Sequence, residues 1–187
     1  EPLLLARVLP TVVAKDRLAG ARFAVQHGAR AIIMDDGLQN PALAKTLSLL
    51  VVDAQVGFGN GRLIPAGPMR EPIGRALSRA DAVVLIGDGD AALLPATDKP
   101  ILRARTNPDA RARALSGKKV LAFCGLAYPQ KFFNTLAACG AALVETVSFP
   151  DHHPYKAGEL NALIARATAA GALLVTTAKD AVRLPAS

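Results

Sequence analysis

The sequence has 187 residues and a formal net charge of +7, because 22 Lys and Arg residues stand against 15 Asp and Glu; 51% of its residues are hydrophobic and 4% aromatic. This apolar content excludes a disordered chain, and the length suits one domain or one domain with a small lobe. Two cysteines exclude a disulfide scaffold, and no apolar run approaches the roughly 20 residues that cross a bilayer. We therefore expect a soluble, compact, cytoplasmic chain.

The predicted elements alternate between buried strands and helices. Short runs of Val, Ile and Leu predict strands at Thr11–Ala14, Ala31–Met34, Leu49–Asp53, Ala82–Ile86, Val120–Phe123, Ala141–Val147 and Leu173–Thr176. Helical patterns lie between them at Asp16–His27, Ile73–Arg79, Pro129–Cys139 and Lys156–Ala170. Continuous apolar strands separated by helices are typical of a parallel sheet covered on both faces, so we predict an α/β fold.

A domain boundary is expected near Ala114–Gly117, where a basic stretch ends and a new strand opens. It divides the chain into residues 1–115 and a smaller lobe, residues 116–187. The basic stretch contains no aromatic residue for stacking on bases, so we predict a solvated linker face and no nucleic-acid partner. An anionic partner, such as a phosphorylated lipid or a membrane surface, is the second interpretation of the charge. The basic residues are Arg103, Arg105, Arg111, Arg113, Lys118 and Lys119.

The first chemical signal is the segment 31–40, in which a predicted apolar strand runs directly into Asp35, Asp36 and Gly37. In open parallel sheets, ligands bind beyond the carboxyl ends of the strands. A carboxylate at that place can hold Mg²⁺, as the Walker B Asp does in P-loop enzymes. Gly37 permits a sharp turn, and Gln39 can hydrogen-bond a polar ligand. A simple polar turn is an equally open interpretation of Asp-Asp-Gly.

The second signal is the glycine-rich segment 57–72, which follows the predicted strand that ends at Asp53. Dense glycines expose backbone N–H groups to an anion, and Arg62 and Arg70 add guanidinium groups suited to phosphate. The segment does not match the dinucleotide-binding fingerprint. Its composition alone favours a flexible surface loop, although a long loop inside a compact domain is usually functional.

Two further signals lie in the second half of the chain. In Asp151-His152-His153, a histidine oriented by a carboxylate fits a general base, because its pKa lies near operating pH. A zinc site is not expected there, because no second cluster of ligands lies nearby in the sequence, and a helix-capping loop is the alternative interpretation. Lys179 follows the last predicted strand, where it is placed either to contact a phosphate or to start a surface helix.

Together these motifs resemble one family, tetraacyldisaccharide 4′-kinase (lipid A 4′-kinase), over essentially the whole chain. The matching segments are Glu1–Ala6, Asp16–Arg17, Asp35–Gln39, Gly57–Glu71, Phe123–Ala127, Asp151–His153 and Thr176–Asp180. The glycine-rich block is the most specific of them. The resemblance implies a P-loop-kinase-like parallel sheet core, incomplete, in residues 1–115 and a smaller α/β lobe with the Asp-His-His motif in residues 116–187.

The resemblance also implies an activity. It is the transfer of the γ-phosphate of ATP, with Mg²⁺, to the 4′-hydroxyl of a disaccharide lipid precursor, which forms lipid IVA at the cytoplasmic face of the inner membrane; we expect a monomer. Carried over to this sequence, Asp35 and Asp36 are Walker B acids near Mg²⁺, and Glu1 helps to position the metal. His152, partnered by a catalytic Asp, activates the sugar hydroxyl. The other residues carried over are Lys179 for the nucleotide and Arg17, Gln39, Asn60, Arg70 and Glu71 for the nucleotide or substrate.

The sequence departs from the family pattern in several places. No G-x-x-x-x-G-K-[ST] motif occurs, and the catalytic Asp that precedes the Glu-Pro pair in the family is absent, as is the N-terminal membrane helix. Asn40 stands where the family usually has His, and Ala178 where it usually has Glu. We therefore expect these residues to be a fragment that does not phosphorylate on its own. The alternative is a non-catalytic relative that binds an anionic lipid and has lost ATP.

Overall fold

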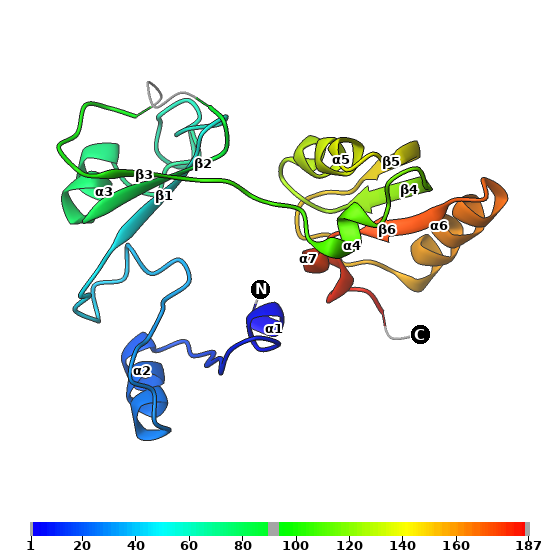
Figure 1. Cartoon of the computed structure of the whole chain (residues 1–187). Helices are drawn as coiled ribbons and strands as arrows, with labels where there is room; N and C mark the ends of the chain where they lie inside the picture. Colours follow the sequence, from blue (N-terminus) through cyan, green and yellow to red (C-terminus); the bar gives the residue numbers. More distant parts are fainter. Residues whose placement is uncertain (1, 90–93, 186–187) are drawn as a thin grey trace. The chain divides into compact units, whose positions relative to one another are not determined.

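Within the part of the chain that the structure describes, two three-stranded parallel sheets carry the fold, and each lies in its own unit (Figure 1). The structure is a computed structural model that describes residues 2–89 and 94–185. We call Val12–Asn107 the middle unit, and Glu1–Thr11 together with Pro108–Ser187 the terminal unit. The predicted α/β class with parallel strands is confirmed. The functional division at residue 115 stays a prediction.

The middle unit has a sheet in the order β1-β2-β3, made of β1 (Leu49–Asp53), β2 (Ala82–Ile86) and β3 (Ile101–Ala104). Its helices are α2 (Arg17–Gln26) and α3 (Ile73–Arg79), both in the predicted places. Asp16 caps α2, because its side chain accepts hydrogen bonds from the N–H groups at the start of the helix. Apolar side chains of β1, β2 and α3 supply most of the core: Val52, Ala54, Leu77, Val83, Leu85 and Leu94.

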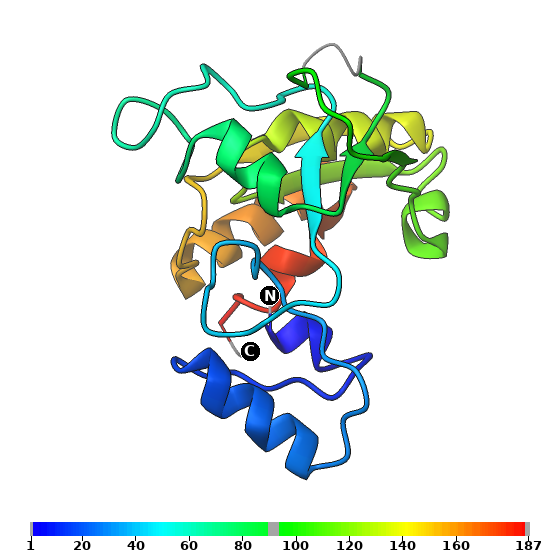
Figure 2. The same ribbon diagram turned by 90° about the vertical axis from the view of Figure 1, so that its left-hand side faces the viewer.

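In the terminal unit, β4 (Lys119–Cys124) lies between β5 (Ala142–Ser148) and β6 (Leu173–Thr176) and is parallel to both. The long helices α5 (Pro129–Ala138) and α6 (Ala157–Ala169) cover opposite faces of this sheet (Figure 2). Its short helices are α1 (Pro2–Leu5), α4 (Ala110–Arg113) and α7 (Ala178–Ala181). Within the described ranges, no helix combines the length and the apolar content needed to cross a membrane.

The side chains of β4 alternate between the two covered faces. Residues 120, 122 and 124 pack with Phe133 and Leu136 of α5, and residues 121 and 123 pack with Leu163 of α6. Because neighbouring side chains of a strand point to opposite faces, a continuous apolar run requires cover on both sides. Cys124 is buried in this way, and burial, followed by the charge of Asp180, raises the pKa of its thiol to about 11.

Two predicted strands are wrong. Thr11–Ala14 and Ala31–Met34 are irregular, and Val13 and Ile33 are 73% and 90% exposed. A strand needs a neighbour for its backbone hydrogen bonds, and neither segment is part of a sheet in the portion of the chain that the structure describes. The linker expected around Arg103 is also wrong at that residue, since Arg103 lies on β3 and pairs with β2.

Candidate functional site

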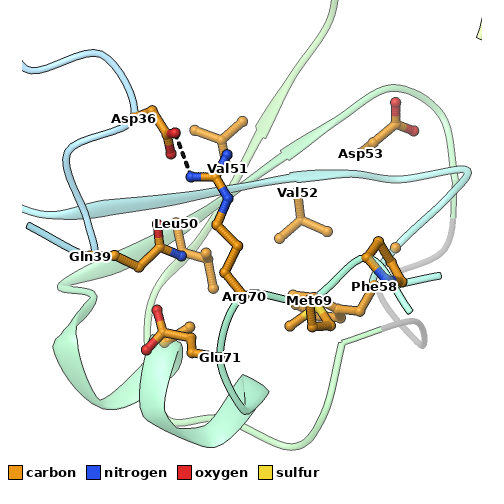
Figure 3. Close-up of a pocket in the computed structure, with 13 residues that line it drawn as sticks. Asp36, Gln39, Leu50, Val51, Val52, Asp53, Phe58, Met69, Arg70 and Glu71 are labelled. Atoms are coloured by element: carbon orange, nitrogen blue, oxygen red, sulfur yellow. Dashed lines mark hydrogen bonds and ion pairs between the residues drawn. The ribbon is translucent and has the colours of Figure 1, made fainter. Parts of the chain in front are cut away.

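A cavity of about 230 Å³ lies along β1 in the middle unit (Figure 3). The strand itself forms one wall, the loop with Asp36 and Gln39 forms a second, and the glycine-rich segment with Arg70 and Glu71 forms a third. All four residues are among those that the sequence assigns to the metal or the substrate. Pockets that enclose a drug-sized ligand measure roughly 300–1,000 Å³, so this cavity suits a phosphate or part of a headgroup.

Arg70 and Asp36 join two walls of this cavity through an ion pair. Arg70 Nη1 donates to Asp36 Oδ2 at 2.5 Å, although the residues are 34 positions apart in the sequence. Figure 3 shows the Arg70 side chain extending toward Asp36, whereas Asp53 points away from the pair. The hydrogen bond to Asp36 and the charge of Asp36 raise the pKa of Arg70. The side chains are 60% and 62% exposed, which leaves the pair open to an anionic ligand.

The backbone around Asp36 fixes where its carboxylate lies. Asp36 has a φ of 52°, in the left-handed region that few residues other than glycine adopt. A Cβ on Gly37 would lie 2.5 Å from the Cβ of Met34, so the chain can come this close only at a glycine. The predicted sharp turn is therefore made by Asp36, and Gly37 permits the close approach. Asp35 is exposed in the same turn and does not line the cavity.

Glu71, at the wall formed by the glycine-rich segment, is held by an ion pair. The residue is 8% exposed, and its carboxylate accepts a hydrogen bond from the guanidinium of Arg79 on α3. A buried carboxylate is stable in its charged form when it is paired in this way. The ion pair with α3 thus fixes the end of the glycine-rich segment and, with it, the neighbouring Arg70.

The glycine-rich segment is folded by Asn60, which the sequence assigns to the substrate. Its side chain donates to Ala66 O at 2.9 Å and accepts from Arg62 N at 3.1 Å. A Cβ on Gly67 would lie 2.1 Å from Asn60 Oδ1, so glycine is required where the loop closes on itself. Asn60 does not line the cavity, and its role toward substrate stays a prediction.

The remaining residues assigned from the sequence lie elsewhere. Arg17 begins α2 and donates to Ala14 O at 2.5 Å. Lys179 lies on α7 in the terminal unit. Glu1 lies outside the described residues. Arg17 is not among the residues that line the cavity along β1, and the roles of all three stay predictions.

The Asp-His-His triplet lies in the terminal unit, between β5 and α6, and its two histidines have different surroundings. His153 is anchored: its ring stacks on Phe149 with centroids 4.7 Å apart, and its Nε2 lies 3.0 Å from Glu159 Oε2. The His152 side chain is 69% exposed, and its Nε2 lies 3.8 Å from Asp151 Oδ2. The ring of His152 is therefore the more accessible of the two to a ligand. The capping role belongs to Glu159, which accepts the Lys156 N–H at the start of α6.

Asp180 is a buried carboxylate that the sequence motifs do not single out. It is 0% exposed and accepts hydrogen bonds from Gly125 N, the Tyr155 hydroxyl, the Thr177 hydroxyl and Arg183 Nη2. Burial, followed by the hydrogen bond to Asp180, raises the pKa of Tyr155, so its hydroxyl remains a donor. The spacing from Thr177 to Asp180 is that of a capping box, a signal in the sequence that points to both residues.

The described ranges contain no group of three or more His, Cys, Asp and Glu side chains that could hold a metal ion. Mg²⁺ is often bound by one or two carboxylates together with the phosphates of a substrate. Asp36 lines the cavity and is exposed, so it suits an ion shared with a phosphate better than a site made of protein alone. Arg70, exposed on the wall of the cavity, can therefore bind an anion.

Three comparisons relate the chain to known proteins. The family model for tetraacyldisaccharide-1-P 4′-kinase matches residues 1–187. The chain is similar to two proteins named tetraacyldisaccharide 4′-kinase. Over the whole chain, the one from Rhodospirillum centenum is 56% identical and the one from Paramagnetospirillum magneticum 54% identical. The chain spans 56% of the length of the first and 58% of the length of the second. A crystal structure of "apo" form LpxK from Aquifex aeolicus in complex with ATP is 28% identical, with a TM-score of 0.67, and the match covers 98% of this chain and 59% of that one.

Proposed function

The chain belongs to the tetraacyldisaccharide-1-P 4′-kinase family, and from this we propose that it carries part of the active site of that kinase. The reaction is the transfer of the γ-phosphate of ATP to the 4′-hydroxyl of a tetraacyldisaccharide 1-phosphate, which forms lipid IVA. The observation that carries the proposal is the cavity along β1. Around it lie Asp36 and Gln39 from one motif and Arg70 and Glu71 from another, and Arg70 is the group there that can bind an anion.

Phosphoryl transfer depends on positioning and on charge stabilisation more than on covalent chemistry by the protein. In the proposed reaction, Arg70 binds a phosphate oxygen through its guanidinium, and Gln39 hydrogen-bonds a polar group of the ligand. Asp36 and Asp35 would hold Mg²⁺, which when bound supplies charge neutralisation at the phosphates. Asp36 is the better supported of the two, because it lines the cavity and Asp35 does not.

His152 acts as the general base. Its imidazole accepts the proton of the sugar hydroxyl as that oxygen forms a bond to the γ-phosphorus; the bond from phosphorus to the bridging oxygen breaks, and ADP leaves with the electron pair. The exposed ring of His152 and the nearby Asp151 carboxylate support this assignment. We also propose that Lys179 and Glu1 serve the nucleotide, and that Arg17 and Asn60 serve the substrate.

The partners follow from the substrate. A lipid with acyl chains and phosphate groups resides in a membrane, and the net charge of +7 favours an anionic surface. We propose that the protein acts as a monomer that binds peripherally to the cytoplasmic face of the inner membrane. Sedimentation with vesicles tests this: binding to vesicles with anionic lipid and not to purely zwitterionic ones is expected, and equal binding to both would contradict it.

The test of the function uses the complete gene product. The protein is incubated with γ-labelled ATP, Mg²⁺ and a tetraacyldisaccharide 1-phosphate in detergent micelles, and the label in the lipid is measured. We expect transfer, and a loss of kcat of roughly 10²–10⁴-fold in His152→Ala, as is typical when a general base is removed.

His27→Gln is the matched control, because His27 is an exposed histidine at the end of α2, outside the cavity. It should leave kcat unchanged. Absence of transfer by the intact wild-type protein would refute the proposal. Lipid binding without transfer would instead support the non-catalytic relative.

A further inference from the structure

The proposed reaction does not use Asp180. Among the described residues of the terminal unit, its carboxylate accepts more hydrogen bonds than any other side chain. Its Oδ1 accepts from the Tyr155 hydroxyl at 2.9 Å, Gly125 N at 3.1 Å and Arg183 Nη2 at 2.5 Å, and its Oδ2 from the Thr177 hydroxyl at 2.6 Å. These donors come from the loop after β4, the loop before α6, and α7 with its flanks. The carboxylate therefore fastens three segments at one point.

Gly125 connects this point to the loop of the candidate base. Its N–H donates to Asp180, and its C=O accepts from Arg183 Nη2 at 3.2 Å and from the backbone N–H of His152 at 3.3 Å. Since Asp180 is ion-paired with Arg183, a change at Asp180 affects both ends of Gly125. The His152 backbone is thus bonded to a residue whose position Asp180 sets.

The contact between these loops leaves almost no free space. A Cβ on Gly125 would lie 3.0 Å from Pro150 O, 3.2 Å from the Tyr155 hydroxyl and 3.3 Å from Asp180 Oδ1. Such distances are tighter than ordinary van der Waals contact, so an added methyl group must displace a neighbour. Gly125→Ala therefore disturbs the same junction while leaving the Asp180 side chain in the sequence.

His152 needs such support, because its φ of 57° is uncommon for a residue other than glycine. A conformation of this kind persists only when the surroundings determine it. The bonds on the His152 N–H run to Gly125 O at 3.3 Å and to Asp151 Oδ1 at 3.0 Å. Loss of the first removes one of the two hydrogen bonds that hold this backbone in its uncommon conformation.

We propose that Asp180 is a positioning residue for His152: through Gly125 and Arg183 it holds the backbone of the Asp-His-His loop in the conformation that presents the His152 ring. Asp180 touches no substrate in this proposal, which rests on the proposed function of His152 as the base. The expected effect on kcat is roughly 100-fold, since a displacement of about 1 Å in a catalytic group costs about that much.

The kinetic test uses the complete gene product in the kinase assay. Asp180→Ala and Gly125→Ala should each lower kcat roughly 100-fold while leaving the KM for ATP nearly unchanged. Asp180→Asn should lose less, because an amide oxygen still accepts from Gly125 and Tyr155. The decisive variant is the double replacement: in a His152→Ala background, Asp180→Ala should lower kcat no further, because its effect passes through the missing imidazole. A full additional loss would overturn the proposal.

The second readout needs no activity. Amide hydrogen exchange of Gly125 and His152 should accelerate in Asp180→Ala and Gly125→Ala relative to the wild type. Leu136→Ala is the control, since Leu136 is buried against the other face of β4, in the cluster that does not contain Tyr155. It should lower the melting temperature while leaving both the exchange of this loop and kcat per folded molecule unchanged.

These readouts separate the possible failures. If the wild-type protein transfers no phosphate, the proposed function fails, and hydrogen exchange still decides whether Asp180 holds the loop. If transfer occurs but exchange at Gly125 and His152 is the same in Asp180→Ala as in the wild type, the positioning role is refuted. If Asp180→Ala does not fold, Gly125→Ala tests the same junction with the carboxylate in place.

Discussion

Replacing Arg70 by glutamine should reduce activity without reducing stability, and the structure explains why the two effects separate. Arg70 and Asp36 are ion-paired at 2.5 Å, but their side chains are 60% and 62% exposed. Exposed pairs contribute only about 0–1 kcal/mol to the free energy of unfolding, because water and salt screen them. The melting temperature of Arg70→Gln should therefore stay close to that of the wild type.

The effect on activity follows from the place of Arg70 on the cavity wall. A hydrogen bond to a charged group is worth about 1.5–3 kcal/mol, and about 1.4 kcal/mol corresponds to a factor of ten in rate or affinity. Loss of the guanidinium should therefore lower kcat/KM for the lipid substrate by roughly 10- to 100-fold. The assay is steady-state transfer of label from ATP to the lipid, together with thermal unfolding of the same preparation.

Arg105→Gln is the matched control, because Arg105 pairs with Asp88 at 3.0 Å in the same unit and both side chains are 76% exposed. It does not line the cavity, so both kcat/KM and the melting temperature should be unchanged. An equal loss of activity in the two variants would mean that general surface charge, and not the cavity, binds the substrate. A stability loss of several kcal/mol in Arg70→Gln would show that the ion pair is structural.

Three further outcomes follow from the surroundings of single groups. The hydrogen bond from Lys156 N lowers the pKa of Glu159, so its charged carboxylate stabilises the fold at pH values above the unfolded pKa of roughly 4.3. The difference in melting temperature between the wild type and Glu159→Gln should therefore be present at about pH 6 and vanish near about pH 3. Because burial raises the pKa of Cys124 to about 11, that thiol should resist a disulfide reagent at pH values near neutrality until the protein unfolds; rapid labelling of native protein would contradict this. Arg79→Met leaves the buried Glu71 without its partner and should lower the free energy of unfolding by about 1–3 kcal/mol in urea titrations; an unchanged midpoint would show that Glu71 is paired otherwise.

The strands were predictable from composition where a neighbour was available to pair with them. Leu49–Asp53 and Ala82–Ile86 are continuous apolar runs, and they pair in parallel as predicted. Ala31–Met34 has the same kind of sequence but forms no strand. An apolar pattern shows that a segment would fit into a sheet, but it does not show whether a neighbouring strand is available. The strand Ile101–Ala104 is not predicted, because Arg103 and Arg105 are typical of a linker. At the edge of the sheet, a strand can carry such charged side chains.

The site was predictable as two motifs and not as one cavity. The Asp-Asp-Gly segment and the glycine-rich segment stand out in the sequence, but the contact of Asp36 with Arg70 spans 34 positions and depends on β1 lying between the two loops. Asp180 cannot be singled out from the sequence for a related reason. Its importance comes from Gly125, 55 positions away, and from Tyr155, so only the folded chain shows that they meet.

Product analysis tests the central claim most directly. The complete gene product is incubated with ATP and a tetraacyldisaccharide 1-phosphate, and the lipid is examined by mass spectrometry with fragmentation of the sugar rings. The account predicts a single added phosphate on the 4′ position, formed only with ATP and strongly diminished in Arg70→Gln and His152→Ala. A phosphate at another hydroxyl, or an unmodified lipid in the presence of folded wild-type protein, would contradict it.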